Sequence, residues 1–375
     1  MFCMAAYADG PYWRSCLEVL CCPTGYSFHR PFSYRREYLS RDLLNIVAEP
    51  EQMRSNISLP SWNAGFVGMR FKSADFRNKF VPLRRVALTS IQEQDTIQVF
   101  FKLGQYVCRS ERATAIDLDG IVDTSKAEDT LFFGVTSDKI GNFQGVQESD
   151  TFPRRLWESL TSPGVISPGA QDNFLNTFVL RFCGCRLHGT SSTLPPERIE
   201  SGGERGDVFG PKLTQGKCYD FDLAYSRIMR AGEASSDIPA FHYEWVPQGD
   251  TLRVAQSIIP VTGNYRMETV WAEVQQSSPA PIELRFIPTT HTPEQTATST
   301  SETKTVELRV RALTVAKFWT RERVLSLAGS LLFLLLAVLF FWLATDKSAA
   351  YVAALGGSAA LFTTLFKDFI MGRTK

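Results

Sequence analysis

The sequence predicts a mainly β protein: an antiparallel β-sandwich or barrel-like cytosolic domain with a few short helices, followed by a C-terminal hairpin of two transmembrane helices. Short runs in which apolar and polar residues alternate, separated by turn residues, predict the β domain. A long uncharged apolar run near the C-terminus predicts the membrane spans. The two signals lie in different parts of the chain, so we expect a separate folded domain and anchor.

The changes in composition divide the chain into five segments. Residues 1–60 have a mixed pattern, with helical spacing of leucines around residues 36–47. Residues 61–288 form the predicted β-rich soluble domain, which the glycine- and proline-containing stretches 163–171 or 201–210 would divide into two subdomains. The remaining segments are a Thr- and Ser-rich loop (289–304), a last strand with the membrane junction (305–323) and the transmembrane hairpin (324–371).

Several runs are typical of strands, and two pairs of runs predict strand pairing. The alternating segments 95–103, 178–187 and 217–225 are predicted strands. Gly263 and Asn264 predict a tight turn between residues 251–261 and 265–275, because such a turn needs residues that tolerate positive φ. We also expect the strand that begins at Ile282 to pair with the strand that begins at Thr305.

Charge and cysteine usage limit the compartment and the partners. The 40 basic and 39 acidic residues nearly cancel, so no global field attracts nucleic acid, and a charged partner must meet a local patch. The start of the chain lacks a basic segment followed by an unbroken apolar run, so no signal peptide is expected. The eight cysteines include adjacent and next-neighbour pairs, which suits reduced thiols. We therefore expect a cytosolic domain.

Two apolar runs, 324–344 and 349–366, predict a membrane protein that crosses the bilayer twice. Basic residues precede the first run and follow the second, which predicts that the N-terminal domain and the C-terminus are both cytoplasmic. The alternative is a single span. Small residues in the second run allow close helix packing, either within the hairpin or between subunits of a homo-oligomer; they are Ala349, Ala353, Gly356, Gly357 and Ala360.

The best ligand-binding candidate is a basic segment interleaved with phenylalanines between residues 66 and 85. Guanidinium groups bind phosphates well, and aromatic rings stack on bases. The segment therefore predicts a site for a phosphate-bearing ligand or a protein partner; the alternative is a strand whose phenylalanines enter the core while the basic side chains face water. The basic residues are Arg70, Lys72, Arg77, Lys79, Arg84 and Arg85.

Two weaker patterns suggest catalysis. The text AIDLDGIVDTS, residues 115–125, resembles the first motif of the haloacid-dehalogenase phosphatases, which implies Asp117 as nucleophile and Asp119 as acid–base group. The alternative is an acidic surface loop. A zinc site is the second pattern, because thiolates and imidazole are the ligands that zinc prefers, and the alternative is a pair of small buried thiols. Its ligands would be Cys183, Cys185, His188 and Cys218.

These patterns lead to two functional hypotheses. The first is a membrane-anchored binding or sensing module, in which ligand or partner recognition by the cytosolic β domain drives self-association of the transmembrane helices, with a membrane-perturbing effector as its sharpest version. The second is a membrane-tethered hydrolase, phosphatase-like or zinc-dependent. The sequence lacks the phosphate-binding loop, the dinucleotide-binding fingerprint and the nucleophile elbow, so no cofactor is expected.

Overall fold

The computed structural model of the chain divides into two units, Met1–Val315 and Ala316–Lys375, and nearly all residues that it describes lie in the first. The described residues are 2–8, 13–35, 64–73, 75–93, 96–109, 115–119, 121–122, 130–135, 143, 146–149, 171, 174–175, 177–203, 206–229, 241–247, 249–290, 304–317, 332 and 335. The described part is mainly β, as the sequence predicts.

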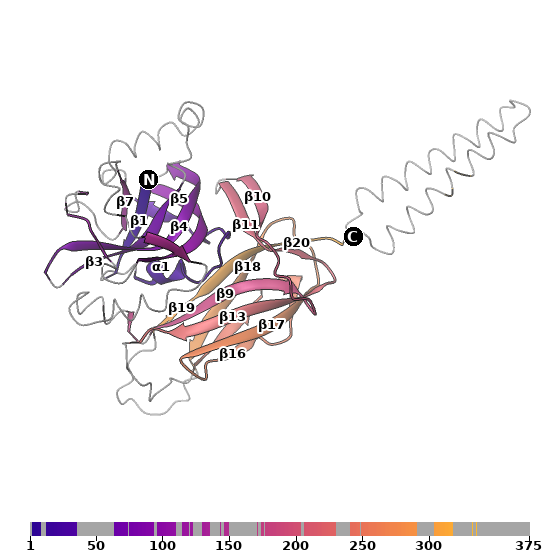
Figure 1. Ribbon diagram of the computed structural model, residues 1–375. Helices are drawn as coiled ribbons and strands as arrows, with labels where there is room; N and C mark the ends of the chain where they lie inside the picture. Colours follow the sequence, from indigo (N-terminus) through magenta and orange to yellow (C-terminus); the bar gives the residue numbers. More distant parts are fainter. Residues whose placement is uncertain are drawn as a thin grey trace, which may run out of the picture. The chain divides into compact units, whose positions relative to one another are not determined.

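Eight of the described strands form one barrel-like sheet in the N-terminal half (Figure 1). Its main path runs β2-β5-β4-β3-β1-β7, with β6 paired to β4 and β8 paired to β5. The end strands of this path, β2 and β7, lie close together, and the Thr130 hydroxyl of β7 donates to the Ser33 carbonyl of β2 at 2.9 Å. The strands are β1 (Phe2–Tyr7), β2 (Phe32–Tyr34), β3 (Ala64–Lys72), β4 (Asn78–Glu93), β5 (Ile97–Arg109), β6 (Ile116–Asp117), β7 (Thr130–Gly134) and β8 (Val146–Ser149).

Strand β1 lies inside this sheet, between β3 and β7, and both of its faces are buried. Phe2 and Met4 enter one hydrophobic cluster, whereas Cys3 and Ala5 enter a second cluster on the other face. A strand that is buried on both faces shows no alternation of apolar and polar residues. This explains why the N-terminal segment had only a mixed pattern in the sequence.

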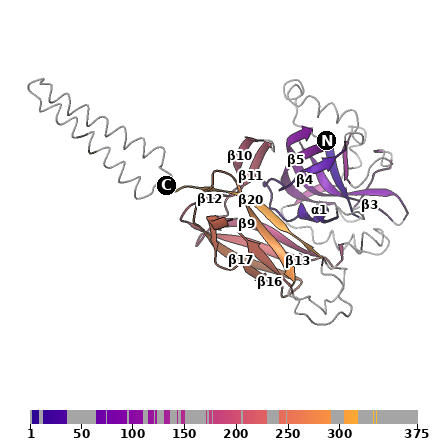
Figure 2. The ribbon, with the colours of Figure 1, turned by 180° about the vertical axis from the view of Figure 1, so that it is seen from behind.

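Two five-stranded sheets of described strands form a β-sandwich in the C-terminal half of the first unit (Figure 2). Aromatic side chains fill the space between the sheets: the ring of Trp245 lies 4.9 Å from that of Phe221 and 5.0 Å from that of Phe286. One sheet is β12 (Lys212–Thr214), β20 (Leu308–Val315), β18 (Ile282–Thr290), β14 (Phe241–Val246) and β16 (Ile258–Pro260) in spatial order. The other is β15 (Leu252–Val254), β17 (Tyr265–Val274), β13 (Cys218–Arg227), β9 (Phe178–Leu187) and β19 (Thr305–Val306).

The predicted strand pairings have mixed outcomes. The prediction for residues 178–187 is confirmed by β9, and the pairing of β18 with β20 is confirmed with Ile282 opposite Ala312. The pairing of 251–261 with 265–275 is confirmed only in part: β15 pairs antiparallel with β17, whereas β16 pairs with β14 in the other sheet, so the predicted tight turn does not form. Neither Gly263 nor Asn264 has a positive φ. The chain changes sheets between β15 and β16, so a single long partner for β17 does not form.

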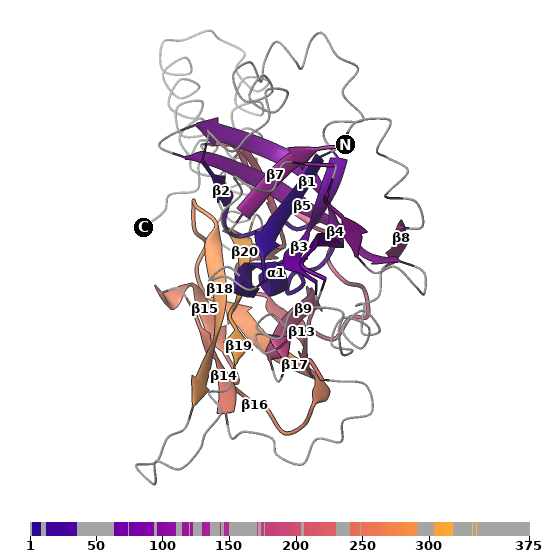
Figure 3. The same cartoon turned by 90° about the vertical axis from the view of Figure 1, so that its left-hand side faces the viewer.

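The two β parts of the first unit share contacts through a short N-terminal segment. It contains helix α1 (Trp13–Glu18), which Figure 3 shows beside β1 and β3, and the loop that follows. The amide of Phe182 donates to the carbonyl of Cys21 at 2.7 Å, and the amide of Ser27 donates to the carbonyl of Phe209 at 3.0 Å. Phe209 lies on β11 (Gly206–Gly210), which pairs with β10 (Glu197–Gly203), and the 3-10 turn Gly249–Thr251 precedes β15.

The predicted two-pass membrane localisation requires correction. Within the described ranges, no helix has both the length and the apolar character needed to cross a bilayer, and α1 has six residues. This finding contradicts a membrane protein with a cytoplasmic N-terminal domain and C-terminus, because each predicted crossing needs a helix of about 20 residues. The runs 324–344 and 349–366 lie outside the described residues, Leu332 and Leu335 excepted, as do the helical pattern at 36–47 and the five small helix-packing residues, Ala349, Ala353, Gly356, Gly357 and Ala360.

Candidate functional site: the β3–β4 hairpin

The predicted basic segment forms β3, β4 and the turn between them. Arg70 on β3 is buried, with 4% of its surface exposed, and its guanidinium lies 4.8 Å from the centre of the Tyr7 ring. Lys72, at the end of β3, is exposed. Arg70 and Lys72 share a face of β3, since they are two residues apart, but Lys72 is the last residue of the strand and reaches solvent whereas Arg70 is covered.

Arg84 on β4 is fully buried and bonds to backbone oxygens. Its Nε donates to the Gly104 carbonyl at 3.0 Å, and its terminal nitrogens donate to the Val19 carbonyl at 3.3 Å and the Thr24 hydroxyl at 3.0 Å. The Cys22 carbonyl is a further acceptor, and the guanidinium lies 4.1 Å from the centre of the Tyr106 ring. Burial lowers the pKa of Arg84. Arg84 thus holds the loop after α1 against β4 and β5.

The other cations of the segment have carboxylate partners. Arg85 pairs with Glu148 on β8 at 2.5 Å. Lys79 and Arg77 both approach Asp117 on β6, at 3.0 and 3.3 Å. A carboxylate that already neutralises these groups weakens their attraction for an added phosphate. The prediction of a phosphate site therefore gains no support from this geometry.

The turn of this hairpin holds its most unusual feature, the exposed side chain of Phe76. This phenylalanine is 83% exposed, and its φ is +60°, in the left-handed region that bulky residues rarely adopt. Hydrogen bonds fix this conformation: the Phe76 amide donates to the Ser73 carbonyl at 2.9 Å, and the Ser73 hydroxyl donates to the Arg77 carbonyl at 3.0 Å. The Ser73 hydroxyl also bonds to Asp75 and lowers the pKa of its carboxyl.

The Phe76 conformation predicts that Phe76→Asn stabilises the protein. Asparagine adopts left-handed backbone conformations readily, so we expect the free energy of unfolding to rise by about 1 kcal/mol. Urea unfolding followed by circular dichroism measures the change. Phe76→Ala is the control, because it removes the ring and keeps an unfavourable backbone. An asparagine variant no more stable than the alanine variant would show that the left-handed conformation costs nothing here.

The two aspartates of the phosphatase-like motif lie at the edge of the barrel-like sheet. Burial acts to raise the pKa of the Asp117 carboxyl. Hydrogen bonds from Lys79, the Asp119 amide and Arg77 act to lower it, and together they outweigh burial, so the net shift of the pKa is downward. The Asp119 amide donates to Asp117 Oδ1 at 3.0 Å, and Asp119 itself is exposed. Asp117 is thus a partner of two cations in an antiparallel β structure, and the resemblance to the phosphatase motif does not extend to this fold.

The four predicted zinc ligands do not form a cluster. Cys183 is exposed and Cys185 is buried, because the bulge at Gly184, whose φ is +148°, interrupts the alternation of β9. His188 Nδ1 lies 2.6 Å from Asp220 Oδ1. Across the described ranges, no three His, Cys, Asp or Glu side chains are close enough together to hold a metal ion, so Cys218 does not complete a site with the other predicted ligands. Burial raises the pKa of Cys185 to about 12, which disfavours the thiolate that zinc requires.

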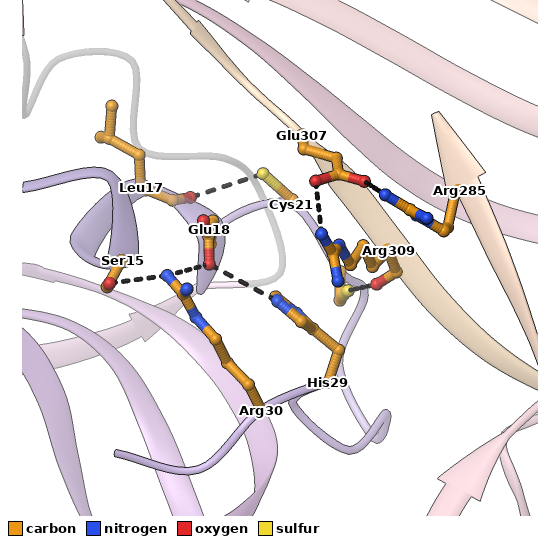
Figure 4. A network of polar contacts seen from close by, with 10 residues as sticks. Ser15, Leu17, Glu18, Cys21, His29, Arg30, Arg285, Glu307 and Arg309 are labelled. Carbon is orange, nitrogen blue, oxygen red and sulfur yellow. Dashed lines mark hydrogen bonds and ion pairs between the residues drawn. The ribbon is translucent and has the colours of Figure 1, made fainter. Parts of the chain in front are cut away.

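A partly buried polar network that the sequence did not predict lies beside α1 (Figure 4). Glu18 pairs with Arg30 at 2.5 Å and lies 3.5 Å from His29. Arg309 on β20 pairs with Glu307 at 2.7 Å, and its carbonyl accepts from the Cys22 thiol at 3.4 Å. Burial, with a smaller contribution from the neighbouring arginines, lowers the pKa of His29 to about 3. Cys22 and Arg309, whose hydrogen bond joins the two halves of this network, are 287 residues apart in the sequence, so no local pattern marks it.

The sequence comparisons assign no family to this chain. Comparison with protein-family models and with curated protein sequences finds no match for this chain. The six predicted ligand-binding residues are therefore judged by their placement alone: Arg70 and Arg84 are buried, Arg77, Lys79 and Arg85 have carboxylate partners, and Lys72 remains exposed near Phe76.

Proposed function

We propose that this chain is a protein-binding module that contacts its partner through the tip of the β3–β4 hairpin. One observation carries the proposal: Phe76 exposes 83% of its surface in a backbone conformation that favours glycine or asparagine. Solvent exposure and backbone strain both disfavour phenylalanine at this position. Residues held in such conformations by their surroundings concentrate at binding sites, and buried aromatic anchors dominate the energetics of protein interfaces.

The charges around the tip define the partner more closely. Lys72 and Arg77 are exposed beside Phe76, and Lys79 is partly exposed. Arg77 and Lys79 share Asp117, and Asp75 lies beside Arg77 at 3.3 Å. An apolar pocket with a mixed, mainly acidic rim would complement this surface, whereas a phosphate group would have to compete with two carboxylates. This balance favours a protein partner over a phosphate-bearing ligand.

Site-specific photocrosslinking tests the proposal. The photoreactive amino acid p-benzoylphenylalanine replaces Phe76 in the full chain, and irradiation in the native cells is expected to give one dominant protein adduct. The same amino acid at Lys217, an exposed turn position on the sandwich, is the control. With the adduct identified, the purified partner is expected to bind the Phe76→Asn variant at least tenfold more weakly than the wild type.

Three results would contradict the proposal. The first is that position 76 gives no adduct beyond those formed at position 217. The second is that the partner binds the wild type and Phe76→Asn equally. The third is nucleotide or phosphate binding that Arg77→Glu abolishes and Phe76→Asn leaves unchanged, which would identify a phosphate-bearing ligand as the true partner. Since Phe76→Asn is expected to stabilise the fold, a loss of binding in this variant cannot be attributed to unfolding.

A further inference from the structure

A cavity of about 330 Å³ lies where β9, β5 and the loop after α1 meet. Phe182 and Leu194 contribute apolar walls, and Thr24 and Thr193 contribute hydroxyls. A volume of this size is at the lower end of the range for small-molecule sites, which combine apolar walls with a few polar groups. The cavity is distant in the sequence from the β3–β4 turn and does not involve the Phe76 surface.

The cavity carries positive charge. Arg181 lines it with only 9% of its surface exposed, and its side chain hydrogen-bonds to Tyr106, another lining residue. Arg84 lies directly behind the wall, because it bonds to the Thr24 hydroxyl and stacks on the Tyr106 ring. Among the described residues that line the cavity, none is Asp or Glu. Buried guanidinium groups in such a setting attract anions strongly, since the local dielectric is low.

An acidic residue whose charge reaches the cavity wall already has partners of its own. The charge of Asp222 acts on Cys183, which lines the cavity. Asp222 forms an ion pair with Arg186 and accepts a hydrogen bond from the Thr269 hydroxyl at 2.7 Å. Its negative charge is therefore offset outside the cavity, and the charge at the cavity wall stays positive.

The hydroxyl of Tyr26 is an independent sign of a ligand. Tyr26 lines the cavity, is 3% exposed, and its hydroxyl has no hydrogen-bond partner among the described residues. Burial raises the pKa of this hydroxyl, so it stays protonated and remains a donor. Buried hydroxyls without a partner are uncommon in folded proteins, because the lost hydrogen bond to water is not replaced. An acceptor atom on a ligand would provide the missing partner.

We infer that this cavity binds a small organic anion, with its carboxylate, phosphate or sulfonate group on Arg181 and the Tyr26 hydroxyl and its apolar part against Phe182 and Leu194. The inference does not depend on the proposed protein-binding function. It identifies a second, separate site, because none of the residues that line the cavity belongs to the β3–β4 turn around Phe76. Cys183 is exposed in the cavity and reports on its occupancy.

The test measures protection of Cys183 in the full chain. N-ethylmaleimide, a neutral reagent, alkylates the thiol, and peptide mass spectrometry follows the rate at this residue. The probe is 8-anilinonaphthalene-1-sulfonate, and its uncharged counterpart is N-phenyl-1-naphthylamine. We expect the sulfonate to slow alkylation of Cys183 at least tenfold and the uncharged dye to have little effect. No slowing, or equal slowing by both dyes, would overturn the inference.

Two matched pairs of variants identify the groups responsible. Arg181→Gln is expected to weaken sulfonate binding at least tenfold, whereas Arg253→Gln, at an exposed position on β15 of the same sheet and outside the cavity lining, is expected to keep it. Tyr26→Phe is expected to weaken binding severalfold, whereas Tyr34→Phe, which also removes a buried hydroxyl without a partner in the described chain, is expected to have no effect. Unchanged binding in Tyr26→Phe and Arg181→Gln would overturn the inference, and Tyr26→Phe keeps the test decisive if Arg181→Gln does not fold.

Discussion

Replacing Arg84 with methionine is expected to lower the free energy of unfolding by about 3 kcal/mol, because several buried carbonyl groups lose their donor at once. Methionine fills a similar volume and removes the desolvation cost of the charge, so the decrease in the free energy of unfolding measures the contribution of the hydrogen bonds. The Val19, Cys22 and Gly104 carbonyls would each lack the bond that Arg84 now donates. Urea unfolding at neutral pH measures the change.

The neighbouring residue provides the control for Arg84. Arg85 carries the same side chain, but it is 44% exposed and pairs with the half-exposed Glu148. Exposed ion pairs contribute little, so Arg85→Met is expected to change the free energy of unfolding by less than about 1 kcal/mol. Equal effects of the two substitutions would show that the internal bonds of Arg84 do not hold the loop after α1 in place.

The strands show which structural features a local sequence pattern can predict. The strand-like run 178–187 predicts β9, and the matched runs predict the pairing of β18 with β20, where every second residue of β20 is buried as alternation requires. Strand β1 is buried on both faces and has no alternation to detect. The transfer of the chain from β15 to β16 depends on the space between two sheets, which no local sequence pattern encodes.

The candidate site shows a similar limit. The basic segment is visible in the sequence, but its partners are not: Glu148 and Asp117 lie far along the chain, and Arg84 bonds to carbonyls that carry no sequence signal. The cationic pattern therefore predicted a ligand surface where the structure has internal pairs. The turn residues around Phe76 are visible in the sequence, but only the backbone reveals that Phe76 is left-handed and exposed.

Acid is expected to destabilise the protein through His29. Burial, reinforced by the charges of Arg30 and Arg309, lowers the pKa of His29 from 6.5 to about 3 in the folded state. Between these two pH values the unfolded chain binds a proton that the folded protein does not. The stabilisation from neutral His29 is complete above pH 6.5 and is lost as pH falls toward 3, by about 1.4 kcal/mol for each pH unit.

Glu18 contributes with the opposite sign and must be separated from His29. Burial raises the pKa of Glu18 above its usual 4.5, even though Arg30 and Arg309 act to lower it. The folded protein therefore holds a proton on Glu18 at pH values where the unfolded chain has released it, and this contribution is lost as pH rises through the folded-state pKa. Glu18→Gln is expected to make the acid destabilisation steeper.

The variant His29→Gln isolates the histidine contribution, because glutamine keeps a polar side chain of similar size that does not titrate. Between pH 6.5 and pH 4, the free energy of unfolding of the wild type is expected to fall by about 3 kcal/mol more than that of His29→Gln. Urea unfolding at several pH values gives both curves. Parallel curves would mean that His29 titrates equally in the folded and unfolded states, and that its surroundings in the folded protein do not disfavour protonation of the imidazole.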